Sequence, residues 1–290
     1  MTSLRFHSRA FLGLTVAGIT LAGCSPAIPT AAPEPASSAE PAAPEPAAPA
    51  APEELEVKVL RELPFDSSIF TEGLEVEGED IWISAGLEGK SALVRQRIPT
   101  SETELGAVTQ RIELAPEYFG EGITRVGDAI WQVTYRAGKA FKYDAASLEL
   151  LSTASYEGEG WGMCSFDDAE MYMSDGSDEI RLLNAEDFSE KGRIAVTLEG
   201  EPQRLINELS CAPDGWIYAN VFTTDQILRI DPAEGKVTGV IDASALRPAE
   251  TKSNNEAVLN GIAHIPGSDH FYLAGKLWPV MYEVQFAPRG

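Results

Sequence analysis

Short apolar runs separated by tight polar turns recur along most of this chain. The clearest runs cover residues 74–83, 130–133, 171–173, 216–221 and 271–273, and Gly, Asp or Pro residues punctuate them. Runs of this kind are typical of β-strands, and no stretch keeps the sustained period of an amphipathic helix. The pattern therefore predicts an all-β protein.

The runs belong to a repeat, in which a glycine-containing cluster is followed by an apolar strand, a turn and a second apolar strand. The five clusters read Phe70-Thr-Glu-Gly-Leu, Tyr118-Phe-Gly-Glu-Gly-Ile-Thr, Gly160-Trp-Gly-Met, Asn207-Glu-Leu-Ser and Leu259-Asn-Gly-Ile-Ala. Successive clusters lie 49, 40, 46 and 53 residues apart when they are anchored on Glu72, Glu121, Trp161, Asn207 and Asn260. Repeats of this length accommodate four short strands, which predicts a five-bladed β-propeller.

The last repeat is one strand short. It has room for strands near 259–264, 270–275 and 280–286 before the chain ends. Residues 55–63 alternate in the manner of a strand and precede the first repeat. We therefore expect this N-terminal strand to complete the last blade and close the ring.

A segment of different composition precedes the repeats. Arg5 and Arg9 stand before an apolar run that ends in Leu21-Ala-Gly-Cys24, which resembles a bacterial lipobox. We expect residues 1–23 to be a lipoprotein signal peptide and Cys24 to be lipidated, with ordinary cleavage beside an incidental cysteine as the alternative. Residues 24–54 are almost wholly Ala, Pro, Glu and Ser, which predicts a disordered linker, and 55–290 form one domain. The expected location is the periplasmic or extracellular face of the cell envelope.

Charge limits the partners of the chain. There are 22 Lys and Arg against 45 Asp and Glu, a formal net charge of −23. Nucleic-acid binding needs a basic stripe, which this sequence lacks, and anionic membrane surfaces are disfavoured beyond the lipid anchor. We expect a monomer.

Cysteine and histidine are scarce. Cys164 and Cys211 fall at nearly the same repeat position in neighbouring blades. Export would preserve a disulfide, but we expect the innermost strands to be too far apart for one, and therefore two buried free thiols. His264 and His270 are not at metal-ligand spacing, so we expect no metal and no zinc hydrolase.

Residues able to bind a ligand or take part in catalysis are expected at one mouth of the propeller. The start of each first strand and the end of each second strand meet there. The openings supply Phe70, Glu72, Glu121, Trp161, Asn207, Glu208 and Asn260, and the closings supply Tyr135, Asp175, Phe222 and Lys276. Acids, amides, a lysine and aromatic side chains in one concavity predict a small-ligand site. Asp175 fits a turn better than the site, since glycine follows it.

These clusters, together with Tyr172-Met-Ser-Asp-Gly-Ser and Gly275-Lys-Leu-Trp-Pro, resemble the glutaminyl-peptide cyclotransferases of the plant and bacterial type. The match runs from about Leu55 to the C-terminus. The resemblance implies a five-bladed propeller enzyme that closes the N-terminal glutamine of peptides or proteins into pyroglutamate and releases ammonia, without a cofactor.

The resemblance also implies roles for single residues. Glu121 is the acid–base carboxylate, and Asn207 and Lys276 support the oxygen of the tetrahedral intermediate. Substrate binding falls to Phe70, Glu72, Tyr135, Trp161 and Phe222. Three of these depart from the family: Glu72 stands where glutamine is usual, and Tyr135 and Phe222 stand where tryptophan is common.

Two other functions remain open at this point. A non-catalytic cell-surface propeller would use the same mouth to bind peptides or proteins. A propeller hydrolase or lactonase would hold a metal ion there with carboxylates and amides.

Overall fold

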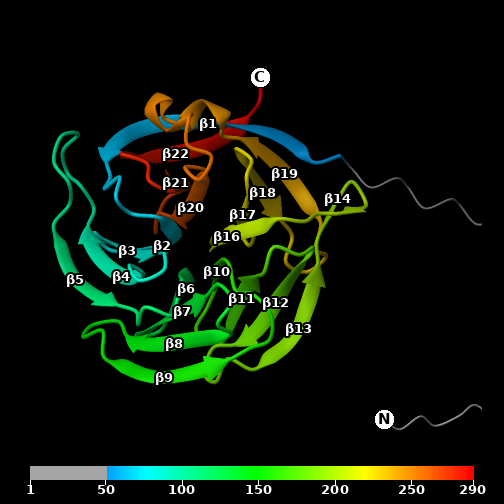
Figure 1. The fold of residues 1–290 in the computed structure, drawn as a ribbon. Helices are drawn as coiled ribbons and strands as arrows, with labels where there is room; N and C mark the ends of the chain where they lie inside the picture. Colours follow the sequence, from blue (N-terminus) through cyan, green and yellow to red (C-terminus); the bar gives the residue numbers. More distant parts are fainter. Residues whose placement is uncertain (1–50) are drawn as a thin grey trace, which may run out of the picture. The chain divides into compact units, whose positions relative to one another are not determined.

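The computed structural model describes residues 51–290, which are almost wholly β-strand (Figure 1). Two short 3-10 helices, η1 (Ser244–Leu246) and η2 (Ala249–Thr251), interrupt them. Within this described part, no helix is long and apolar enough to cross a membrane. The all-β prediction is confirmed, whereas the predicted signal peptide, Cys24 and the linker up to residue 50 lie outside the described residues.

Residues 51–290 contain five four-stranded antiparallel units, each an up-and-down meander. The first two units are β2 (Thr71–Glu77), β3 (Asp80–Ala85), β4 (Ala92–Arg97) and β5 (Val108–Glu113), then β6 (Gly120–Val126), β7 (Ala129–Thr134), β8 (Lys139–Asp144) and β9 (Leu150–Ser155). The third is β10 (Met163–Cys164), β11 (Glu170–Ser174), β12 (Glu179–Asn184) and β13 (Glu190–Ala195). The fourth is β16 (Ile206–Cys211), β17 (Ile217–Val221), β18 (Gln226–Ile230) and β19 (Val237–Asp242).

The fifth unit is made from both ends of the described chain. Its strands are β20 (Leu259–His264), β21 (His270–Gly275), β22 (Val280–Pro288) and β1 (Glu53–Pro64). A small hairpin, β14 (Thr197–Leu198) and β15 (Glu201–Pro202), lies between the third and fourth units in sequence.

The first strand of each unit faces a common centre (Figure 1). These five inner strands, β2, β6, β10, β16 and β20, each contact the next around the centre, and β20 contacts β2. Residues that open an inner strand are therefore close in space although they lie far apart in sequence.

The predicted pairing of the two ends is confirmed. Strand β1 pairs antiparallel with β22, from Leu55 opposite Pro288 to Pro64 opposite Val280. It begins at Glu53, two residues inside the segment expected to be linker. The start of β1 also pairs in parallel with β19, which joins the fourth and fifth units into one eight-stranded sheet, and the sequence did not indicate this second contact.

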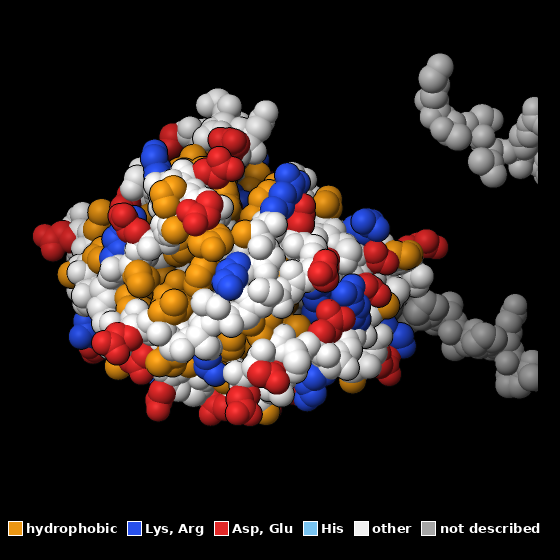
Figure 2. Space-filling model, turned by 60° about the horizontal axis from the view of Figure 1, so that its bottom comes forward, with side chains coloured by type: hydrophobic (Ala, Val, Ile, Leu, Met, Phe, Trp, Pro, Cys, Tyr) orange, Lys and Arg blue, Asp and Glu red, His pale blue; other side chains and the backbone are white. Residues whose placement is uncertain are grey.

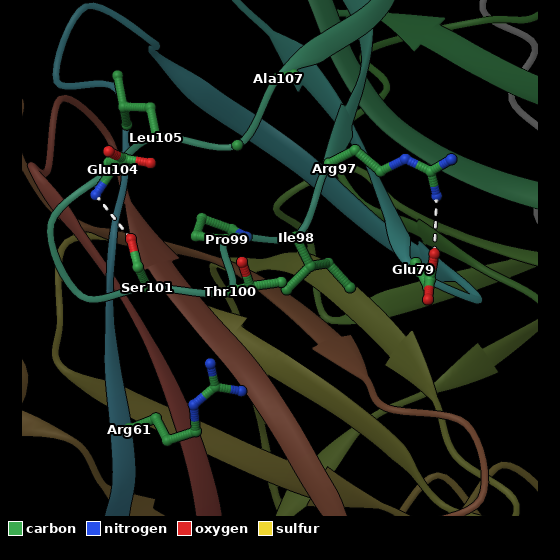
Figure 3. A pocket seen from close by; sticks show the side chains of 11 residues that line it. Arg61, Glu79, Arg97, Ile98, Pro99, Thr100, Ser101, Glu104, Leu105 and Ala107 are labelled. Atoms are coloured by element: carbon green, nitrogen blue, oxygen red, sulfur yellow. Dashed lines mark hydrogen bonds and ion pairs between the residues drawn. The ribbon is translucent and has the colours of Figure 1, made fainter.

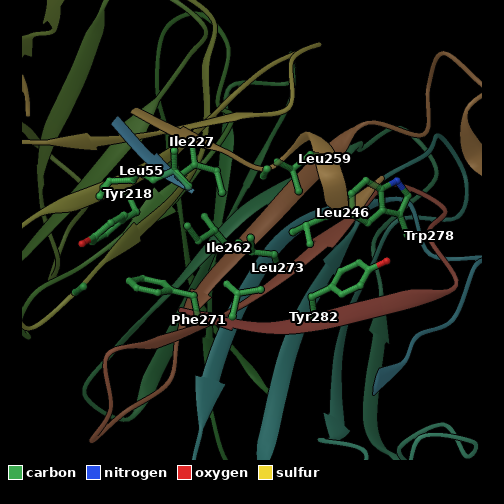
Figure 4. Close-up of a cluster of buried hydrophobic side chains, with 14 of the residues drawn as sticks. Leu55, Tyr218, Ile227, Leu246, Leu259, Ile262, Phe271, Leu273, Trp278 and Tyr282 are labelled. Carbon is green, nitrogen blue, oxygen red and sulfur yellow. The ribbon is translucent and has the colours of Figure 1, made fainter. Parts of the chain in front are cut away.

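Two buried leucines, near the two ends of β1, hold this strand in place. Leu63 is fully buried and Leu55 is 5% exposed, whereas Leu60 on the same strand is 37% exposed. Leu55 enters a hydrophobic cluster between the fourth and fifth units that also contains Phe271 and Trp278 (Figure 4). Burial of these apolar side chains supplies the main free energy of closure.

The expectation of two free thiols is wrong, because Cys164 and Cys211 form a disulfide. Their Cα atoms are 5.4 Å apart, well within the range of a bridge. The inner strands approach this closely because Gly162 has no side chain: a Cβ there would lie 2.2 Å from the carbonyl oxygen of Asn207. The disulfide therefore links the inner strands of the third and fourth units.

Candidate functional site

A cavity of about 160 Å³ lies where the inner strands begin. Its walls are Phe70, Glu72, Phe119, Glu121, Tyr135, Trp161, Asn207, Phe222 and Lys276. All eight residues predicted for catalysis or substrate binding are among these nine. The strand openings and closings of the repeat thus converge on one pocket.

Phe119 is the one lining residue that the sequence reasoning missed. A signal for it was present, because Phe119 precedes Glu121 by two positions just as Phe70 precedes Glu72. The two phenylalanine rings meet edge to face, with centroids 6.2 Å apart. The first and second units therefore contribute equivalent Phe-x-Glu elements to the pocket.

Three residues expected at the mouth do not line the cavity. Asp175 holds Arg181 in an ion pair of 3.0 Å and caps its own turn at Ser177. Glu208 is fully buried and accepts a hydrogen bond from the Leu74 N–H. Asn260 is fully buried, and its side-chain amide donates to Glu72 and to the Thr71 carbonyl oxygen.

Glycines in the inner strands bring the pocket residues together. A Cβ on Gly122 would lie 2.4 Å from the carbonyl oxygen of Trp161, a contact that only glycine avoids. The Gly122 N–H donates to that oxygen at 2.6 Å, which fixes Trp161 against the strand that carries Glu121. In the third unit, the hydroxyl of Ser174 on β11 donates to the Asn207 carbonyl of the fourth unit at 2.7 Å. Backbone contacts between units therefore position the site.

Glu72 and Lys276 form a buried ion pair at the floor of the pocket. The Lys276 ammonium donates to Glu72 Oε1 at 2.8 Å, and the Asn260 amide donates to Glu72 Oε2 at 3.0 Å. The same ammonium lies 4.7 Å from the ring centroid of Phe70 and 5.3 Å from that of Phe222, so two aromatic faces share its charge. The cation predicted to stabilise an oxyanion is thus already paired with a carboxylate.

Glu121 and Glu72 line the same cavity, and their carboxyl groups lie close enough to share a hydrogen bond. Two carboxyl groups in such contact require a proton between them. Burial raises the pKa of Glu121 well above its ordinary value, and the charges of Glu72 and Glu208 raise it further. Burial also raises the pKa of Glu72, but Lys276 opposes this and leaves it at about 7. Lys276 and Asn260 both donate to Glu72 and favour its ionised form, so the proton of the pair lies on Glu121.

Aromatic side chains form the wall around these carboxyl groups. The rings of Trp161 and Phe222 meet edge to face at 5.4 Å, and Phe119 and Tyr135 lie 5.9 Å apart. At the rim, Glu159 accepts hydrogen bonds from the indole N–H of Trp161 at 3.1 Å and from Arg136 at 2.8 Å. The Arg136 guanidinium in turn stacks over Tyr135 at 4.4 Å. Glu159 therefore fixes two walls of the pocket at once.

A larger hollow, of about 550 Å³, lies beside the loop between β4 and β5 (Figure 3). Several of its polar groups already have partners: Arg97 pairs with Glu79 at 3.2 Å, Arg61 pairs with Glu283 at 3.3 Å, and the Ser101 hydroxyl accepts from the Glu104 N–H at 3.1 Å. None of the residues predicted to be functional lines it. Size alone does not make this hollow the candidate site.

The surrounding surface agrees with the acidic composition. Acidic side chains are spread over the face shown in Figure 2, around a central area where hydrophobic side chains gather. Among residues 51–290, no three His, Cys, Asp or Glu side chains converge in an arrangement that would hold a metal ion.

A small pocket with two carboxyl groups, a buried lysine, an amide and five aromatic side chains is typical of an enzyme that performs acid–base chemistry on a small polar group. The family model for glutamine cyclotransferase matches residues 31–286, and the chain belongs to this family.

Two known proteins illustrate the similarity. A glutaminyl-peptide cyclotransferase of Arabidopsis thaliana is 31% identical over 234 residues, which cover 79% of this chain and 71% of that protein. The crystal structure of Myxococcus xanthus glutaminyl cyclase superposes with a TM-score of 0.75 at 34% identity, covering 82% of this chain and all of that one.

Proposed function

We propose that this chain converts the N-terminal glutaminyl residue of peptides or proteins into pyroglutamate and releases ammonia. Family membership and the two relatives support this activity. The observation that carries it is the Glu121 carboxyl, held protonated by burial inside an aromatic pocket. Such a group is able to donate a proton near neutral pH and to take up another once its own has passed to a neighbouring base.

The reaction needs little else from the protein. The α-amine attacks the side-chain amide of its own residue, so nucleophile and electrophile already belong to one molecule. The main task of the enzyme is to hold the glutamine in its reactive conformation. We assign this task to the aromatic walls formed by Phe70, Tyr135, Trp161 and Phe222, which surround the aliphatic part of the substrate.

Two further steps require polar groups. We assign proton transfer from the amine to the leaving ammonia to Glu121. We assign support of the tetrahedral oxyanion to Asn207 and Lys276, which line the same cavity. Glu72 lies between these groups and contacts both Glu121 and Lys276.

The finer architecture and the location are also part of the proposal. The five four-stranded units, with inner strands in a closed ring of contacts, support a five-bladed β-propeller. We also propose that it acts as a monomer. The lipobox-like sequence before Cys24 supports export and lipid anchoring in the cell envelope of a bacterium. Loss of the protein from the membrane fraction on Cys24→Ser substitution is the expected result, and retention there would refute the anchor.

The test of activity is mass spectrometry of glutaminyl peptides incubated with the purified protein. We expect a loss of one ammonia per peptide that persists in chelator, and a fall in kcat of about 10²–10⁴-fold in Glu121→Gln. Glu117→Gln is the matched control, because Glu117 is exposed just before the same strand. Undiminished cyclisation by Glu121→Gln would remove the assigned acid–base group.

The same experiment separates the other functions. Peptide binding without ammonia release would indicate a non-catalytic binding protein. Loss of turnover in chelator would indicate a metal-dependent enzyme, for which the pairing of Glu72 with Lys276 offers no support, since the lysine already neutralises that carboxylate.

A further inference from the structure

Lys276 presents a difficulty for the proposed chemistry. Its ammonium is held by Glu72 at 2.8 Å in a buried site, where Glu72 is 1% exposed. A lysine whose charge is neutralised in this way gives little support to an oxyanion. Something must weaken the ion pair at the moment when the oxyanion forms.

The contact between Glu72 and Glu121 offers the means. The two carboxyl groups share a proton, which lies on Glu121 because Lys276 and Asn260 both donate to Glu72 and stabilise its ionised form. A proton that crosses this contact to Glu72 would neutralise it. The ion pair with Lys276 would then be lost without any movement of the backbone.

We propose that Glu72 stores a proton during the reaction and thereby couples deprotonation of the substrate amine to the release of Lys276 toward the oxyanion. This proposal rests on the proposed cyclotransferase activity.

The α-nitrogen forms a bond to the amide carbon, and the carbonyl electron pair moves to oxygen. Glu121 takes the amine proton while its own proton passes to Glu72, so that Lys276 becomes free to stabilise the oxyanion. The bond to the leaving nitrogen then breaks, Glu121 donates its proton to that nitrogen, and ammonia departs. The proton stored on Glu72 finally returns to Glu121.

The charges around the pair are consistent with one stored proton. Glu72 faces Lys276, Asn260, Glu121 and Glu208, and Glu121 also lies near Tyr156. With a single proton on the two carboxyl groups, their charge and that of Lys276 sum to zero. When the pair loses this proton at higher pH, the pocket gains a negative charge and the acid needed by the leaving group is absent.

The test compares the wild-type protein with Glu72→Gln. For the wild type we expect a fall in kcat on the alkaline side, where the pair loses its remaining proton, and a curved dependence of rate on the deuterium fraction of the solvent, because two protons move together. For Glu72→Gln we expect a fall in kcat of about tenfold or more, no alkaline fall from the pair, and a linear deuterium dependence.

Glu75→Gln is the control, since burial raises the pKa of Glu75 to about 7 on the same strand, yet Glu75 does not line the cavity. It should keep the wild-type profile and deuterium dependence. A linear dependence in the wild type, or an identical alkaline fall in Glu72→Gln, would overturn the proton store while leaving cyclisation intact. A wild-type protein that releases no ammonia would instead remove the proposed function itself.

Discussion

Removal of the disulfide between Cys164 and Cys211 should destabilise the domain strongly. The bridge closes a loop with a sequence separation of 47 residues between the inner strands of two units. On the chain-entropy account, opening a loop of that length costs about 4 kcal/mol, because the unfolded chain regains the freedom that the bridge removed. In a domain of this size the loss corresponds to a fall in Tm of about 8–16 °C.

The assay is urea unfolding of the wild type and of the Cys164→Ala/Cys211→Ala double variant, followed by tryptophan fluorescence. Wild-type protein unfolded with and without a reductant gives an independent estimate that needs no substitution. We expect the two comparisons to agree to within about 1 kcal/mol, since removal of the loop constraint is common to both. A loss below about 1 kcal/mol in both would show that the inner strands hold the two units together without the bridge.

Activity should respond much less than stability. The Gly122 N–H to Trp161 bond and the Ser174 hydroxyl bond to Asn207 still connect the inner strands when the disulfide is absent. We therefore expect kcat at 25 °C to change by less than about threefold, well under the effect of removing an acid–base group. A loss of activity with unchanged stability would mean that the bridge shapes the pocket rather than the fold.

Two further predictions concern the closing strand and the pocket rim. Leu63→Ala should cost about 2–5 kcal/mol in urea unfolding, because Leu63 is fully buried, whereas Leu60→Ala on the same strand should cost less than about 1 kcal/mol; equal losses would disprove the role of burial in closure. Glu159→Gln should raise KM by about 3–10-fold with little change in kcat, since it weakens charge-assisted bonds that fix Trp161 and Arg136. A fall in kcat at constant KM, measured by steady-state ammonia release, would contradict that rim role.

Most of the fold could be predicted from the sequence repeat. Strands expected near 259–264, 270–275 and 280–286 are β20, β21 and β22, because alternation and turn residues are local properties that sequence displays directly. The parallel contact of β1 with β19 was not predictable in this way. This contact depends on the distance between the outer strands of two neighbouring units, and no local sequence pattern indicates that distance.

The same division holds for the site. The opening and closing positions predicted which residues meet, including Glu121 and Asn207, because ring geometry alone brings them together. The pairing of Glu72 with Lys276 was missed, since it depends on side-chain distances between residues 204 positions apart. The disulfide was missed for a related reason. The inner strands approach closely because Gly162 has no side chain, and a glycine in the sequence does not by itself indicate which strand packs against it.

The double pairing of β1 has a mechanical consequence. The strand is held along one edge by β22 and at its start by β19, and Arg229 adds an ion pair to Glu53 at 3.0 Å. A force applied at residue 51 along the strand direction would load these hydrogen bonds simultaneously, in shear, instead of breaking them one after another. The strand that closes the ring is thus also suited to bear tension, and its rate of rupture would set how long the domain withstands a pull from its N-terminal side.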